Sequence, residues 1–73
     1  MKTKGPDYQR LAANIRERRH KLCLTQAEAS LRANCAVSTW RRMEQGEGGL
    51  SAEMLFRAAK ALECRASALV EGA

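Results

Sequence analysis

Residues 24–46 constrain the fold most, because they hold two helix signals separated by a short turn. Thr25 and Glu28 have the spacing of a capping box, in which each side chain accepts a hydrogen bond from the backbone N–H of the other residue. Asn34 then interrupts the helical pattern, at a point where a tight turn needs a residue that tolerates positive φ. A second helix over about 36–45 stops at Gly46, which suits the left-handed position after a helix. Two short helices joined by so short a turn predict a helix-turn-helix.

The length of the chain limits it to one small domain. A chain of 73 residues buries only about 60–65% of its extended surface, so its stability should be marginal or shared with a partner subunit. There is no run of about 18 apolar residues, and no apolar stretch follows the charged N-terminus, so we expect neither a membrane span nor a signal peptide. The sequence therefore predicts a cytoplasmic protein with a flexible arm over residues 1–6 and a domain over 7–73.

Apolar residues recur at helical spacing in the remaining segments. Leu11 and Ile15 form a stripe that also contains Arg19, which needs a partner because an unpaired buried charge is too costly. Ser51 suits the N-cap of a further helix, and a last helical turn ends at Gly72. No alternating run indicates a strand. The prediction is an all-α domain of five helices.

Trp40 has two interpretations. Ala29 and Ala33 place small side chains on the preceding helix, so the indole can fill the space that they leave in the core. The alternative is that the indole stacks on a nucleic-acid base. We favour the core position, since small faces opposite one large ring indicate volume compensation.

The positive charge is concentrated in the first part of the chain. Up to Arg42 there are ten Lys or Arg against three acids, a balance of +7, and from Met43 onward three against five, a balance of −2. Such a distribution fits a region that meets phosphates, although an ordinary solvated basic face would look the same. Charge alone does not decide between them.

The cysteines and the single histidine do not indicate a metal site or a disulfide scaffold. Cys23, Cys35 and Cys64 are an odd set without C-x-x-C spacing, and His20 is the one histidine, without an obvious partner. We interpret the thiols as small, half-buried apolar groups and His20 as a solvated side chain.

Many short motifs occur in a fixed order along the chain. Within the helix-turn-helix they are Leu24-Thr25-Gln26, Glu28, Ser38-Thr39, Trp40, Met43-Glu44 and Gly46. Outside it they are Ile15-Arg16-Glu17, Arg19, Leu50-Ser51, Leu55 and Ala59-Lys60-Ala61-Leu62. In this order and without gaps, from about residue 11 to residue 72, the chain resembles the lambda-repressor-like (Xre/Cro) helix-turn-helix family. The resemblance implies a compact five-helix domain that binds DNA.

The resemblance also implies roles for individual residues. The helix over about 36–45 matches the recognition helix, which lies in the major groove. Its candidate base-reading residues are Val37, Ser38, Arg41 and Arg42. Either arginine can bind guanine bidentately, and an equally fair interpretation is that one of the two reaches only a phosphate.

Other matched positions imply contacts to the DNA backbone and one structural pair. Gln26 matches a position whose amide contacts a phosphate at a helix N-terminus. Weaker candidates for backbone contacts are Thr25, Thr39 and Gln45. Arg19 and Glu44 match a pair that joins the first helix to the end of the third, which supplies the partner that the arginine needs.

The chain departs from the family pattern at several positions. Ala36 stands where Ser or Thr usually caps the recognition helix, at a cost of about 1 kcal/mol unless Asn34 compensates. Asn34 and Cys23 both replace usual glycines, and residues 47–49 lack the cations that often grip phosphate there. Weak backbone contacts favour a dimer, for which we expect the two-fold seam to involve Phe56, Ala66, Leu69 and Val70.

Two classes of function fit this sequence. The first is a bacterial or phage transcriptional regulator, acting as a repressor, that binds a palindromic double-stranded DNA operator as a homodimer. The second is an antitoxin-like or adaptor module that mainly binds another protein. No pair of carboxylates, nucleophile–base set or cofactor motif points to an enzyme. We therefore expect no catalytic residues, metal or cofactor, and no small-molecule pocket is implied in so small a chain.

Overall fold

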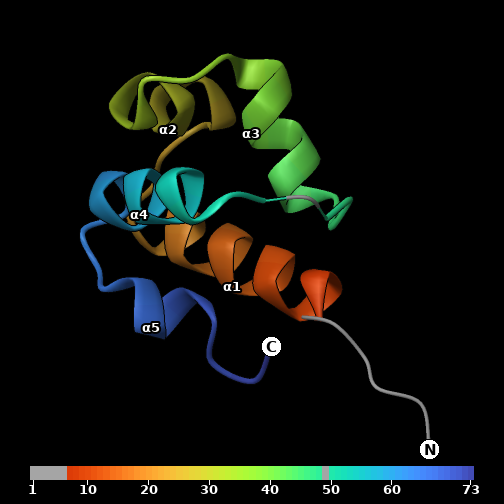
Figure 1. Ribbon diagram of the computed structural model, residues 1–73. Helices are drawn as coiled ribbons and strands as arrows, with labels where there is room; N and C mark the ends of the chain where they lie inside the picture. The colour runs from red at the N-terminus through yellow and green to blue at the C-terminus, as the bar shows by residue number, and fades with distance from the viewer. Residues whose placement is uncertain (1–6, 49) are drawn as a thin grey trace, which may run out of the picture.

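The computed structural model describes residues 7–48 and 50–73, and Figure 1 shows their arrangement. Within these residues all regular structure is helical, as the sequence predicts. The helices are α1 (Tyr8–Lys21), α2 (Gln26–Ala33), α3 (Val37–Glu44), α4 (Ala52–Ala61) and α5 (Ala66–Leu69). The prediction of an arm over residues 1–6 falls outside the described residues, so it stays a prediction.

The helices pack around one core. α2 packs against α3 and α4, while α1 packs against α3 and α5, and α4 also contacts α5. In Figure 1 α4 lies between α1 and α2, with α3 along one side. The largest fully buried side chains are Ile15, Trp40, Leu62 and Leu69. These four side chains come from α1, α3, the end of α4 and α5. One core therefore holds together helices of at most 14 residues.

Trp40 occupies the core position that the sequence favours. Its side chain is fully buried, and Ala29 and Ala33 are 0% and 2% exposed. All three belong to the same apolar cluster. The base-stacking interpretation of Trp40 is wrong, because the indole does not reach the surface.

Three of the four long helices start at a side-chain cap. The Asp7 carboxylate accepts from the backbone N–H of Arg10 at 3.1 Å, and the Ser51 hydroxyl accepts from that of Met54 at 3.1 Å. The capping box of α2 is complete. Ala36 precedes α3 without any side-chain cap, and Asn34 does not compensate. The N-terminus of α3 therefore lacks the side-chain hydrogen bond that the other three long helices have.

The helix ends use the left-handed conformation, and one case was not predicted. Asn34 and Cys23 each have φ of 57°, and Gly46 has φ of 72°. Glu63, which follows α4, also has φ of 56°. Most L-residues pay about 1–2 kcal/mol in this region, whereas Asn tolerates it, so the helix ends at Cys23 and Glu63 carry local strain.

Arginine side chains satisfy the carbonyls at helix C-termini. Arg18 donates to the carbonyl oxygens of Leu62 and Glu63 at 2.9 and 3.0 Å, next to the end of α4. Arg57 donates to the carbonyls of Ala33 and Asn34 at the end of α2. Helix C-termini carry partial negative charge and unpaired carbonyls, so cations are favourable there. These arginines were counted in the sequence only as part of the overall charge.

One residue of the predicted dimer seam, Leu69, is buried in the structure. Leu69 is 1% exposed and packs in the core of its own domain, so it cannot contact a second subunit as proposed. Its backbone carbonyl accepts from the Asn14 side chain at 2.8 Å, which ties α5 to α1. Phe56 and Val70 are 63% and 39% exposed, and Ala66 is half-buried.

None of the helices in residues 7–48 and 50–73 is long and apolar enough to cross a membrane.

Candidate nucleic-acid interface

The inner face of α3 is fixed by the carboxylate of Glu44, which is 3% exposed. Arg19 of α1 forms a bidentate ion pair with this carboxylate, with Nε 2.5 Å from Oε2 and Nη2 2.9 Å from Oε1. The Trp40 indole N–H donates to Oε2 at 2.5 Å, and the Gln26 amide donates to Oε1 at 3.0 Å. One carboxylate thus connects α1, α2 and α3. The ion pair between Arg19 and Glu44 that the resemblance implies is present, and it gives the buried arginine its partner.

The surroundings of Glu44 keep it ionised. Burial by itself raises the pKa of this carboxyl group, but the hydrogen bonds from Arg19, Gln26 and Trp40, together with the charge of Arg19, outweigh burial and hold the pKa below its ordinary value of 4.5. Arg19 also donates to the carbonyl of Leu24 at 2.9 Å. A charged pair with its remaining donors satisfied is the form in which a buried charge is stable.

The outer face of α3 carries the predicted base-reading residues. Ser38, Arg41 and Arg42 are exposed, and Val37 is half-buried at the start of the helix. Neither arginine donates a side-chain hydrogen bond to any residue of the described ranges. Because Trp40 and Glu44 hold the opposite face of α3 in the core, these side chains project outward from a rigid element.

The predicted backbone-contact residues are differently placed. Thr25 uses its hydroxyl to accept from the N–H of Glu28 at 3.0 Å, and its own N–H donates back to the Glu28 carboxylate at 2.8 Å. These hydrogen bonds lower the pKa of Glu28. Gln26 has one of its two amide N–H groups available after its bond to Glu44. Gln45 is exposed at the end of α3, and its carbonyl accepts from the Gln9 side chain at 3.3 Å.

The three cysteine thiols do not belong to the outer face of α3. Cys23 is exposed, while Cys35 and Cys64 are half-buried, and all three are free. Burial raises the pKa of the Cys35 and Cys64 thiols, which leaves less of the reactive thiolate. No group of three or more His, Cys, Asp or Glu in the described part of the chain could hold a metal ion.

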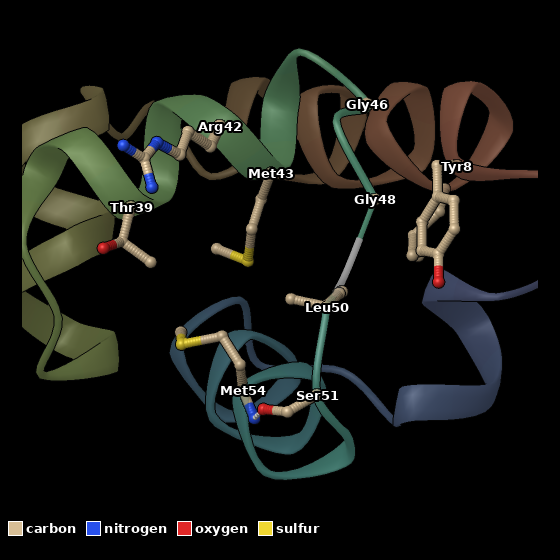
Figure 2. Close-up of a pocket in the computed structure, with 10 residues that line it drawn as sticks. Tyr8, Thr39, Arg42, Met43, Gly46, Gly48, Leu50, Ser51 and Met54 are labelled. Carbon is tan, nitrogen blue, oxygen red and sulfur yellow. Dashed lines mark hydrogen bonds between the residues drawn. The ribbon is translucent and has the colours of Figure 1, made fainter.

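A cavity of about 340 Å³ lies beside the outer face of α3, which differs from the expectation that the chain has no pocket. Figure 2 shows Arg42 and Thr39 of α3 at one end of it and Tyr8 of α1 at the other, with Met43 and Leu50 between them. The cavity has no sequence signal, because its walls come from α1, α3, α4 and the loop between α3 and α4, which only the fold brings together.

Comparison with known proteins agrees with this geometry. A family model described as a helix-turn-helix domain matches residues 10–71. A search of curated protein sequences finds no match. Among solved structures the chain is similar to the clp gene regulator ClgR from C. glutamicum, with a TM-score of 0.82 and 19% sequence identity, covering 93% of this chain and 88% of that chain. At this identity the structural likeness concerns the fold alone, whereas the family match spans most of the sequence. The chain belongs to the Xre-like helix-turn-helix family, a family of DNA-binding domains.

Proposed function

We propose that this protein is a sequence-specific transcriptional regulator that binds double-stranded DNA with α3 in the major groove. The observation that carries the proposal is the outer face of α3, where Arg41 and Arg42 project without a partner in the described residues from a helix fixed by Trp40 and Glu44. A rigid helix with outward arginines is suited to enter the groove and reach base edges. The similarity to a gene regulator supports the same role.

The proposed contacts divide into two kinds. Val37, Ser38, Arg41 and Arg42 read bases, with either arginine bidentate to guanine and Val37 against a thymine methyl group. Phosphates are met by the free N–H of the Gln26 amide and, more weakly, by Thr25, Thr39 and Gln45. The backbone N–H of Thr25 is used in the cap of α2, but its hydroxyl oxygen only accepts there, so the O–H remains free to donate to a phosphate.

The proposed active form is a homodimer on a palindromic operator, and the expected effect is repression. An 8-residue recognition helix reaches few base pairs, so two copies about one DNA turn apart supply the missing specificity. Phe56 and Val70 are the exposed apolar residues for such a seam, since Leu69 is buried. A domain that occupies DNA excludes other proteins from it, which makes repression the direct outcome. The site of action is then the cytoplasm, at the DNA, and no catalytic step is involved.

Selection of bound duplexes from a random pool, followed by binding measurements on the selected sequence, tests the proposal. Arg42→Ala should cost about 1–3 kcal/mol on the selected duplex and relax the preference at one base step. Gln26→Ala should instead weaken all duplexes alike, because phosphates carry no sequence information. Arg41→Ala is the matched comparison that shows which arginine reads a base. If no sequence is enriched, the proposed specificity is wrong.

Sedimentation of the chain with the selected duplex tests the dimer. The expected stoichiometry is two chains of 8.1 kDa per duplex, and Phe56→Ser should reduce it. A single chain per duplex, with a monomeric mass in free solution, would contradict the homodimer without affecting the DNA-binding proposal.

The alternative is an adaptor or antitoxin-like module of the same fold. The observation behind it is Leu31, an apolar side chain that is 81% exposed on α2 and that a protein partner would cover. Such a module would bind duplex DNA weakly at every salt concentration, whereas a DNA reader loses affinity steeply as salt rises.

A further inference from the structure

The cavity beside α3 is mainly apolar. Leu11, Met43, Leu50 and Met54 contribute its walls together with the ring of Tyr8. Figure 2 shows Tyr8, Met43, Leu50 and Met54 around a common space. Leu11 belongs to the core and is 6% exposed, so the cavity reaches from the surface to the core. Pockets of this volume, with apolar walls and few polar groups, are typical of small-molecule sites.

Among the described residues, one charged side chain lines this space. Arg42 is the one Lys, Arg, Asp or Glu of residues 7–48 and 50–73 in the cavity wall, and its guanidinium lies at the end of the cavity beside Thr39 in Figure 2. It has no hydrogen-bond or ion-pair partner within residues 7–48 and 50–73. The Ser51 hydroxyl on the opposite wall is already used as the cap of α4, where it accepts from the N–H of Met54. Arg42 is exposed, so water solvates its charge in the free protein and the guanidinium is available to pair with an anion that enters the cavity.

The start of α4 lies on the opposite wall. α4 has 10 residues and starts at Ala52, directly after Ser51 of the cavity wall. The partial positive charge of a helix N-terminus favours anions near its first turn, so this wall does not oppose a negatively charged ligand. An anion with an apolar body is complementary to both the charge and the walls, whereas a phosphate diester supplies only the charge.

We propose that this cavity binds a small carboxylic acid with an apolar body, of the medium-chain or aromatic type, whose carboxylate pairs with Arg42. A volume of about 340 Å³ corresponds to roughly 11 waters at ~30 Å³ each, so the ligand has on the order of ten non-hydrogen atoms. The carboxylate forms a bidentate pair with the guanidinium, and the chain or ring lies against Met43, Leu50 and Met54.

The ligand and DNA compete for one side chain. This second step rests on the proposed function, in which Arg42 reads a base in the major groove. An arginine held by a carboxylate in the cavity cannot donate to guanine at the same time, so ligand binding lowers operator affinity. The protein then senses an apolar acid without a separate effector domain.

Calorimetric titration of the full chain with octanoate and with naphthoate, without DNA, tests the site. The expected dissociation constant is about 0.1–1 mM for at least one of them. Arg42→Gln should weaken binding about tenfold, and Arg41→Gln, its exposed neighbour outside the cavity, should change it less than about twofold. Met54→Gln should also weaken it, while Met54→Leu should retain it. Far-UV circular dichroism shows that each variant is folded.

Three results overturn the site: no binding of either acid, equal binding of octylammonium, or affinity that Arg42→Gln leaves unchanged. The competition is measured separately, with the selected duplex. At a ligand concentration ten times its dissociation constant, operator affinity should fall about tenfold for each subunit that contacts the duplex. Unchanged affinity overturns the competition. Failure of the chain to bind any duplex would instead contradict the proposed function, and the titration without DNA would still decide the site.

Discussion

At the scale of single residues, Glu44 is the buried carboxylate that fixes the inner face of α3, the helix whose outer face carries Arg41 and Arg42. Its two oxygens accept from Arg19, Gln26 and Trp40, which belong to α1, α2 and α3. All described buried side-chain polar atoms have a partner, so no buried donor or acceptor of the network is unsatisfied. A satisfied network of this kind specifies one arrangement of the three helices, because any shift leaves a buried charge unpaired.

Removing the charge of Glu44 should therefore destabilise the domain strongly. Glu44→Gln leaves the Arg19 guanidinium buried without its counter-charge, and we expect a loss of about 3 kcal/mol in the free energy of unfolding, measured by urea denaturation. Glu47→Gln removes an exposed acid from the same region and should change the free energy by less than about 0.5 kcal/mol. Equal stability of the two variants would show that the pair contributes little.

The same carboxylate makes stability depend on pH in the acid range. Its pKa is lower in the folded state than the ordinary 4.5, so its contribution is present above that value and disappears as pH falls through the folded pKa. We expect urea midpoints that are nearly constant from about pH 7 to pH 6 and fall below about pH 4.5. Glu44→Gln should show a shallower decrease, with the remainder due to groups such as Glu28. An identical pH profile in the variant would contradict this assignment.

At the scale of elements, the five helices differ mainly in how their ends are satisfied. α1, α2 and α4 have side-chain caps at their N-termini, and α3 has none. The C-termini of α2 and α4 receive arginine donors from other helices, namely Arg57 and Arg18. Each of these two helices is thus stabilised partly by tertiary contacts at its end.

Restoring the missing cap of α3 should stabilise the protein. Ala36 has φ of −69° and ψ of 148°, the extended geometry of an N-cap, so Ala36→Ser can accept from a backbone N–H of the first turn without strain. We expect a gain of about 1 kcal/mol in thermal or urea unfolding. Ser51→Ala removes the corresponding cap of α4 and should cost a similar amount. If Ala36→Ser has no effect, solvent already satisfies the start of α3.

At the scale of the whole molecule, much of the positive charge is used inside the fold. Arg16, Arg18 and Arg19 of α1 all donate to backbone or carboxylate oxygens of other segments. Arg32 donates to Glu63 and forms an ion pair with it. The balance of +7 up to Arg42 therefore overstates the charge that can meet DNA, and the outward arginines of α3 are a small part of it.

This distribution predicts a modest salt dependence of DNA binding. If each subunit neutralises about two or three phosphates, the slope of log affinity against log salt should be about −2 to −3 per subunit, measured by fluorescence anisotropy. Neutralisation by all ten early cations would give about −9. A slope near the larger figure would show that the arginines at helix ends leave their carbonyls when DNA binds.

Local features were predictable, and contacts between distant segments were not. The capping box of Thr25 and Glu28, the left-handed Asn34 and Gly46, and the burial of Trp40 depend on spacings of a few residues. Arg19 was recognised as needing a partner because burying a charge has a large and general cost. The arginine donors at helix ends, the burial of Leu69 and the left-handed Glu63 depend on where other segments lie, so no local pattern marks them.

The sequence by itself determined the helices, the turn of the helix-turn-helix and the family, because hydrophobic period, capping residues and motif order act over short distances. Only the tertiary structure decided which cations face outward and that a cavity opens beside Arg42. The physical reason is that the outward cations and the cavity both depend on how side chains from separate helices pack against one another. No single segment of the chain contains that information.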